Sequence, residues 1–225
     1  MSDPLVDTVF RPTTASPALA SAAPVRVTGT RTRAGNAMSR TRTALMAGAA
    51  RAVETSGTKI AMAQVAVSAG VAKATLYNHF RTREAVLNAL VVDQVDTLVR
   101  AQAGKPLDAA LTDAALAISS NPVRAALARL EPAALASLAR IDDAAAGWRC
   151  ARVGVDIALE QAGLGGSTTV LRWLASFLVS PADASAVTAD VAVLLAGLPG
   201  RRSGESAADA DARPAVRPRP TPRSA

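Results

Sequence analysis

Residues 65–80 read VAVSAGVAKATLYNHF, which has the composition of a helix, a glycine turn and a second helix. Ala66 offers a small side chain where the first helix must approach the second, and Gly70 can adopt the positive φ angle that ends a helix. Val71 and Leu76 are spaced to point back into the angle between the helices. The spacing predicts a helix-turn-helix, although an ordinary surface helical hairpin in an alanine-rich chain shows the same pattern.

The sequence around this stretch is more specific. From Leu45 to Leu90 the chain runs through LMAGAARAVETSG, MAQVAVSAGVAKATLYNHF and RTREAVLNAL. These segments resemble the N-terminal domain of the tetracycline-repressor (TetR) family of bacterial transcription regulators. The resemblance implies an all-α fold, with a three-helix helix-turn-helix DNA-binding domain followed by a helical domain for ligand binding and dimerisation.

The resemblance also assigns roles to the second helix of the motif, residues 72–79, which would lie in the major groove. Lys73, Ala74 and Asn78 would then face base edges, while hydroxyl, imidazole and guanidinium groups would hold phosphates. Tyr77 alone is equally consistent with a core position, and a single histidine is more often structural or solvated. The expected DNA-contacting set is Lys73, Ala74, Thr75, Tyr77, Asn78, His79 and Arg83.

Two positions depart from the family pattern. Ala61 and Ala72 stand where family members commonly carry Thr or Ser at the start of the second and third helices. Each loss removes a side-chain cap, which typically stabilises a helix by about 1 kcal/mol. Thr58 is a possible replacement cap for the second helix, whereas the third helix has none nearby.

Composition limits the other classes of function. The 225 residues are 50% hydrophobic but only 3% aromatic, and strand-type alternation is nearly absent, which favours an all-helical fold. One histidine and one cysteine, without clustered ligand spacing or a glycine-rich phosphate loop, argue against an enzyme, a metal site or a cofactor. Cys150 excludes an intrachain disulfide and is interpreted as a small buried hydrophobe rather than a redox group. The longest apolar run, residues 191–198, is too short to span a bilayer, so a cytoplasmic protein without membrane contact is expected.

Charge is distributed unevenly along the chain. The net charge is +7, and residues 40–90 hold seven basic and two acidic residues, whereas residues 91–200 hold eight basic and eleven acidic ones. A basic helix-turn-helix segment and a slightly acidic remainder suit a molecule that meets DNA at one end. A protein that coats DNA without sequence preference has a similar charge and stays open as an alternative.

Helix breakers and composition divide the chain into four parts. Residues 1–37 and the Arg/Pro-rich residues 200–225 are expected to be disordered tails, and a start at Met38 would leave the first tail out of the native protein. Residues 38–82 form the expected DNA-binding domain, and residues 83–199 the effector-binding and dimerisation domain. Helices are expected at about 40–56, 61–68, 72–79, 82–102, 107–120, 122–130, 132–140, 142–163, 168–180 and 183–197.

The role of the second domain follows mainly from the resemblance. Two late helices, about 142–163 and 168–180, are the candidates for the homodimer interface, although a Trp/Phe/Leu band is also typical of a monomer core. The expected interface residues are Trp173, Leu174, Phe177 and Leu178. The effector is an apolar or amphipathic molecule of unknown identity, and no set of ligand-binding residues is defined. Polar or large residues that are candidates to line its pocket are Asn88, Gln94, Arg124, Trp148, Arg152 and Asp156.

Taken together, the sequence predicts a transcriptional regulator that binds specific double-stranded DNA, most simply a ligand-responsive homodimeric repressor of a palindromic operator. The alternative is a degenerate family member that senses a ligand or binds a protein without specific DNA binding. The uncapped helices at Ala61 and Ala72 keep this alternative open.

Overall fold

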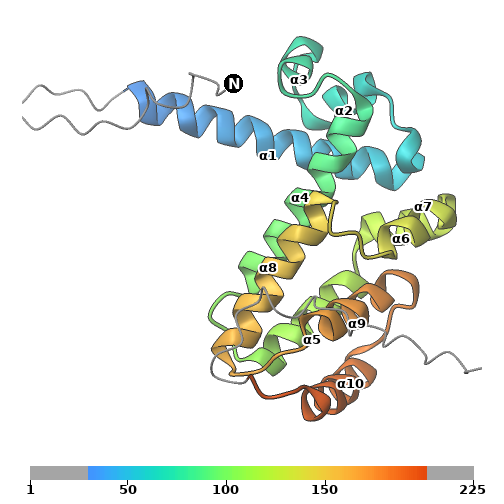
Figure 1. Ribbon diagram of the computed structural model, residues 1–225. Coiled ribbons are helices and arrows are strands. Elements are labelled where there is room, and N and C mark those ends of the chain that lie inside the picture. The colour runs from blue at the N-terminus through green and yellow to red at the C-terminus, as the bar shows by residue number, and fades with distance from the viewer. Residues whose placement is uncertain (1–29, 202–225) are drawn as a thin grey trace, which may run out of the picture. The chain divides into compact units, whose positions relative to one another are not determined.

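The computed structural model describes residues 30–201, and every regular element in this part of the chain is a helix. The strand-like pairing among these residues is an isolated bridge between Leu164 and Gly200. The all-α fold expected from the sequence is confirmed. In Figure 1 the elements are α1 (Thr30–Ser56), the 3-10 turn η1 (Gly57–Lys59), α2 (Met62–Ala69), α3 (Lys73–His79), α4 (Arg83–Gln102), α5 (Leu107–Ser119), α6 (Pro122–Leu130), α7 (Pro132–Ala139), α8 (Ala146–Gln161), α9 (Ser167–Val179) and α10 (Ala184–Gly197).

Polar side chains cap the starts of α4, α6 and α10. The Thr82 hydroxyl accepts a hydrogen bond from the Ala85 amide at 3.1 Å, at the beginning of α4. The Asn121 side chain accepts the Arg124 amide at 2.9 Å, and Pro122 follows it as the first residue of α6. Proline is favoured there because the first amide of a helix has no intrahelical acceptor. These breakers explain why the observed helices lie close to the expected ranges.

The first helix is longer than expected. It begins at Thr30, so the prediction of an unstructured tail is wrong for residues 30–37. The chain contains no proline between Pro24 and the end of α1, and a helix that is held by its packed C-terminal part can therefore continue in the N-terminal direction. The rest of that predicted tail, residues 1–29, lies outside the described residues.

The predicted C-terminal tail also begins later than residue 200. The Arg201 amide donates to the Gly163 carbonyl at 2.9 Å, and its guanidinium lies 3.3 Å from the Glu160 carboxylate. Residues 200 and 201 are thus paired with the α8–α9 connection, because a short extended segment can satisfy the carbonyl groups of that turn. Residues 202–225 lie outside the described part of the chain.

Buried side chains form two clusters. The first joins α1–α4 to α6 and α7, and its larger members are Leu45, Met46, Val53, Ile60, Val65, Leu76, Phe80, Val86, Leu90, Val123, Leu127 and Leu135. The second joins α5, α8, α9 and α10 through Leu111, Ala115, Leu159, Val170, Phe177, Val187 and Val191. The core of the helix-turn-helix therefore does not end at α4 but continues into α6 and α7. None of the helices within residues 30–201 is long and apolar enough to cross a membrane.

Helices α4 and α8 run side by side and approach closely (Figure 1). A Cβ atom added at Gly147 would lie 2.9 Å from a Val91 methyl, and one at Gly154 would lie 2.7 Å from the Val99 methyls. Glycines seven residues apart share one face of a helix, so this face of α8 lies directly on the valine side chains of α4. Any larger side chain at these two positions would push the helices apart.

Candidate nucleic-acid interface

The turn between α2 and α3 has the geometry expected of a helix-turn-helix. Gly70 adopts φ 66° and ψ 31°, in the left-handed region. Its amide donates to the Val67 carbonyl and the Val71 amide donates to the Ala66 carbonyl, both at 3.1 Å. This pair of hydrogen bonds forms a Schellman motif, which satisfies the last carbonyl groups of α2 and turns the chain into α3. A Cβ at Gly70 would meet nothing within 4 Å, so glycine is required here by its φ angle rather than by space.

Helix α1 holds the C-terminal end of α2. A Cβ at Gly48 would lie 2.6 Å from the backbone nitrogen of Ala69, well inside contact distance. The Arg51 guanidinium donates a hydrogen bond to the Ser68 carbonyl in the same turn. The glycine thus allows α1 to touch the turn of the motif, and the arginine ties the two helices together.

Helix α3 has one buried face and one exposed face. Leu76 is completely buried and Phe80 is 7% exposed, so these two side chains fix the helix on the core. The predicted DNA-contacting residues on the opposite face are exposed, namely Lys73, Ala74, Tyr77 and Asn78, whereas Thr75 and His79 are half-buried. Tyr77 is 42% exposed, which argues against a core role. The Lys73 ammonium lies 5.9 Å from the centre of the Tyr77 ring, so the structure brings these two side chains together.

The first turns of α2 and α3 carry no side-chain caps, as Ala61 and Ala72 predict. Thr58 does not replace the cap of α2. Its backbone amide and its hydroxyl both donate to the carboxylate of Glu131, at 2.9 and 2.5 Å. The prediction that Thr58 caps α2 is therefore wrong, because a carboxylate 73 residues away in sequence holds it in η1.

Arg83 is the first residue of α4, four residues after the end of α3. Its guanidinium lies 3.0 Å from the Glu84 carboxylate, and both side chains are largely exposed. The pKa of Glu84 is lowered, first by a hydrogen bond from its own backbone amide and then by Arg83. Exposed ion pairs are weak in water, so Arg83 can exchange Glu84 for a phosphate at little cost.

The cap at Thr82 gives a direct test of how α4 begins. The Thr82→Ala substitution removes the acceptor of the Ala85 amide and is expected to lower the free energy of unfolding by about 1 kcal/mol. Urea denaturation followed by circular dichroism measures the loss. Thr82→Ser keeps the hydroxyl and should match the wild type, whereas equal stability of the alanine variant would show that the cap contributes nothing.

Two arginines of α1 near the motif were not among the residues predicted from the sequence. The Arg42 guanidinium lies 5.8 Å from the centre of the Phe80 ring, and Arg51 donates to Ser68 as described above. Arg42 therefore places a positive charge beside the end of α3. The only sequence signal for it is the run of basic residues before Leu45, which does not reveal which of them reaches the motif.

Several polar residues considered for the effector site are hydrogen-bonded within the protein. The Asn121 amide donates to the Gln94 side chain at 3.0 Å, and the Arg124 guanidinium lies 3.4 Å from the Leu178 carbonyl at the end of α9. The indole of Trp148 donates to the Leu138 carbonyl, and Arg152 pairs with Asp143 at 2.7 Å. Among residues 30–201, two buried side-chain nitrogens find no partner, Nε of Arg124 and Nε1 of Trp173.

The four residues expected at the dimer interface pack, wholly or in part, against the cores of the single chain. Phe177 is only 3% exposed and belongs to the second core cluster, and its ring lies 4.8 Å from that of Trp173 in an edge-to-face arrangement. Trp173 and Leu174 pack against the same cluster, and Leu178 packs against the first one. Phe177 is therefore a core residue of the single chain, whereas Trp173, Leu174 and Leu178 remain partly exposed beside it. The large apolar side chains that α8 and α9 do expose are Val153, Ile157 and Val179.

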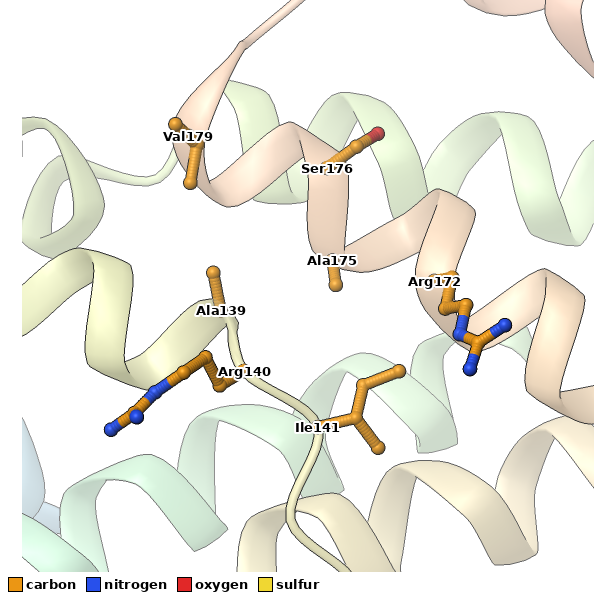
Figure 2. A pocket seen from close by; sticks show the side chains of 7 residues that line it. All are labelled: Ala139, Arg140, Ile141, Arg172, Ala175, Ser176 and Val179. Carbon is orange, nitrogen blue, oxygen red and sulfur yellow. The ribbon is translucent and has the colours of Figure 1, made fainter.

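A hollow of about 460 Å³ lies between the end of α7 and the exposed side of α9, and Figure 2 shows the side chains that line it. Small and apolar side chains face the hollow, and one arginine lies on each side of it. Its lining residues are Ala139, Arg140, Ile141, Arg172, Ala175, Ser176 and Val179. The hollow is open to solvent and shallow, and it borders the exposed face of α9.

The remaining candidate for chemistry, Cys150, is half-buried on α8. Burial raises the pKa of its thiol, as does the negative charge of Asp96 nearby. A raised pKa disfavours the reactive thiolate. No group of three or more His, Cys, Asp or Glu side chains with the arrangement of a metal site occurs among the described residues.

Residues 45–90 match the model of a family described as bacterial regulatory proteins, tetR family. No curated protein matches the chain. One similar solved structure, described as "Molecular basis for control of antibiotic production by a bacterial hormones", is 22% identical over 71% of this chain and 97% of its own, with a TM-score of 0.46. A second, a TetR transcriptional regulator from Rhodococcus sp. RHA1, is 23% identical over 71% of this chain and 98% of its own, with a TM-score of 0.40.

Proposed function

Because the chain belongs to the TetR family of bacterial DNA-binding transcription regulators, we propose that it is a ligand-responsive homodimeric repressor that binds a palindromic operator. The observation that carries the proposal is the exposed face of α3. Leu76 and Phe80 fix this helix on the core, so that Lys73 and Tyr77 project from a rigid support. A short helix presented in this way fits the major groove.

Within the groove, the exposed residues of α3 would divide the contacts. Lys73 and Asn78, with the small Ala74 beside them, would face base edges, and Tyr77 would hold a phosphate. The half-buried Thr75 and His79 would contact phosphates at the edge of the helix, together with Arg83 from the start of α4. The expected DNA-contacting set thus remains our proposal.

The test compares two duplexes, the DNA upstream of the protein's own gene and a shuffled duplex of the same composition. The Lys73→Ala/Tyr77→Phe variant should bind the upstream duplex at least about thirtyfold more weakly, since a base contact contributes about 1–3 kcal/mol and a phosphate contact adds to it. Fluorescence anisotropy at fixed salt measures the affinities. The control, Arg129→Ala, removes one positive charge at an exposed site on α6 and should leave the preference between the duplexes unchanged.

The outcomes separate the alternatives. If the wild type binds the shuffled duplex as tightly as the upstream one, the repressor proposal fails and a protein that coats DNA without sequence preference is favoured. If it binds neither duplex, a ligand-sensing or protein-binding role is favoured. If the double variant loses the same affinity for both duplexes, Lys73 and Tyr77 contact phosphates only. A loss confined to the upstream duplex supports direct contact with its bases.

A palindromic operator requires a second copy of the chain, and we place it on the outer faces of α8 and α9. Val153 is 59% exposed and Ile157 is 51% exposed, and both lie on α8. Val179 on α9 is 62% exposed and borders the hollow shown in Figure 2. A two-fold contact buries the same patch on both copies, so these side chains would pack against their own counterparts.

The helices that follow the helix-turn-helix would bind the effector. The Arg124 Nε and Trp173 Nε1 groups are buried donors without a partner among the described residues, and such groups cost about 1–3 kcal/mol each. An effector with acceptor oxygens would satisfy them, which supports ligand binding near α6 and α9. Helix α4 begins beside α3 and extends through Gln102, so a tilt of α4 would change the separation of the two recognition helices. The effector drives this tilt only if it binds the conformations with and without the tilt of α4 with different affinities.

A further inference from the structure

Glu131 connects the helix-turn-helix to the α6–α7 pair. One carboxylate oxygen accepts the Thr58 amide at 2.9 Å, and the other accepts the Thr58 hydroxyl at 2.5 Å. Thr58 lies in η1, the turn that leads from α1 into α2. Both oxygens of one carboxylate are therefore committed to a residue that precedes the DNA-binding helices.

The backbone around Glu131 is held firmly. The residue is at once the end of α6 and the cap position of α7. Its amide donates to the Leu127 carbonyl at 2.8 Å, and its own carbonyl accepts the Ala134 amide at 3.0 Å. Pro132 follows as the first residue of α7 and restricts the chain further. A rigid junction between two helices thus presents the carboxylate.

The approach of the carboxylate to η1 depends on Gly57. This residue is buried with φ +62°, and a Cβ added to it would lie 2.3 Å from the Glu131 carboxylate. A side chain at this position would be strained by its backbone and would also displace the carboxylate. The turn is therefore shaped to receive Glu131.

Charge reinforces the contact. The pKa of Glu131 is lowered, first by the hydrogen bond from the Thr58 hydroxyl, and Lys59 and Arg83 contribute in the same direction. The carboxylate is therefore ionised at neutral pH, and hydrogen bonds to an ionised acceptor are stronger than those between neutral groups. The apolar side chains of Val123, Leu127 and Leu135 join the same two parts of the molecule through the first core cluster.

We propose that Glu131 is a positioning residue for operator binding. By accepting two hydrogen bonds from Thr58, it fixes α2 and α3 in the orientation that the operator requires. The proposal rests on the function proposed above, because it assumes a specific duplex. Glu131 itself does not contact DNA, since a carboxylate would repel phosphate. It acts through η1, because a palindrome is bound tightly only when the two recognition helices are about one helical turn of DNA apart.

The first experiment measures affinity for the upstream and shuffled duplexes in three variants. Thr58→Val, which removes the hydroxyl hydrogen bond, should weaken binding to the upstream duplex about tenfold, the equivalent of one charge-assisted hydrogen bond. Glu131→Ala, which removes both hydrogen bonds, should weaken it at least as much. Binding to the shuffled duplex should change by less than about twofold, because it depends on charge rather than orientation. Thr58→Ser keeps both hydrogen bonds and should restore the wild-type affinity.

Two controls distinguish a loss of helix orientation from unfolding of the protein and from the mere loss of a negative charge. Thermal unfolding establishes that each variant is folded at the assay temperature. Asp190→Ala removes a negative charge from an exposed site on α10 and should bind both duplexes like the wild type. A merely structural role of Glu131 would reduce binding to both duplexes in parallel, in proportion to the unfolded fraction, and would overturn the proposal.

The second experiment does not involve DNA. Cysteines introduced at the exposed Ala63 of α2 and Ala133 of α7 carry spin labels, and Cys150→Ala removes the native thiol. Double electron–electron resonance then measures the distance between α2 and α7. Labelled protein is diluted into an excess of unlabelled protein, so that each dimer carries one labelled chain. The distribution should be narrow in the wild type and in Thr58→Ser, and broad in Glu131→Ala and Thr58→Val.

The two experiments fail in different ways. A wild type without preference for the upstream duplex would overturn the proposed function, and the spin labels would then decide whether Glu131 holds the turn. Distance distributions that stay narrow in Glu131→Ala would overturn the positioning role, whatever the DNA affinities are. A broadened distribution together with a selective loss of upstream binding supports it.

Discussion

Gly48→Ala is expected to lower the free energy of unfolding by about 1–3 kcal/mol. Because it displaces the turn of the helix-turn-helix, it should also weaken specific DNA binding. The added Cβ would lie 2.6 Å from the nitrogen and the Cβ of Ala69, and 2.7 Å from its Cα. The obstacle is mostly backbone, which cannot rotate away as a flexible side chain can. Urea denaturation and duplex binding measure the two effects.

The sign of this prediction makes it stringent. Inside a helix, replacing glycine by alanine ordinarily stabilises by about 1 kcal/mol, because alanine has the higher helix propensity. Gly197→Ala, near the end of α10, is the matched control, since a Cβ there meets nothing within 4 Å, and it should be neutral or slightly stabilising. A Gly48→Ala variant that is stabilised like the control would show that α1 does not touch the turn of the motif.

Val153→Asp/Ile157→Asp is expected to convert the proposed dimer to a folded monomer and to lower affinity for the proposed operator by about a thousandfold, towards the affinity for nonspecific DNA. Both side chains are exposed in a single copy, so charges there cost little in the monomer but would face each other across a two-fold contact. Sedimentation gives the molecular mass, and anisotropy gives the affinity.

Val193→Asp controls for the added charge, because Val193 is 75% exposed and lies on α10, a helix that is not part of the proposed contact. It should remain dimeric and bind the operator. Persistence of the dimer in the double variant would exclude the outer face of α8 as the interface. Aspartates at Trp173 and Phe177 would not test dimerisation, because Phe177 lies in the core and its loss would unfold the domain.

The sequence was most informative where one residue has a local physical effect. Gly70 ends α2, Thr82 begins α4, and the pair Asn121 and Pro122 begins α6, each within a few residues of the predicted position. The inward positions of Leu76 and Val71 also follow from helical spacing, since Leu76 is buried and Val71 packs against the same cluster. These signals depend on neighbours within one or two turns, which a sequence displays directly.

The sequence was less informative about partners that lie far apart along the chain. The Trp173 and Phe177 band was recognised as a stripe, but periodicity does not reveal whether a second copy or the chain's own α5 and α10 cover it. Thr58 has the composition of a cap, yet its hydroxyl is taken by Glu131, 73 residues further on. Gly48 resembles any other small residue of an alanine-rich helix until the position of Ala69 is known.

The glycine-mediated contact of α8 with α4 has a thermodynamic consequence. With Gly147 and Gly154 seated on Val91 and Val99, α4 cannot tilt unless α8 moves with it. If the second copy docks on the outer face of α8, the same movement alters the strength of subunit association. Effector binding and dimer assembly would then be linked equilibria, so each must change the other by the same factor. The apparent affinity for the effector would accordingly depend on the concentration of the protein itself.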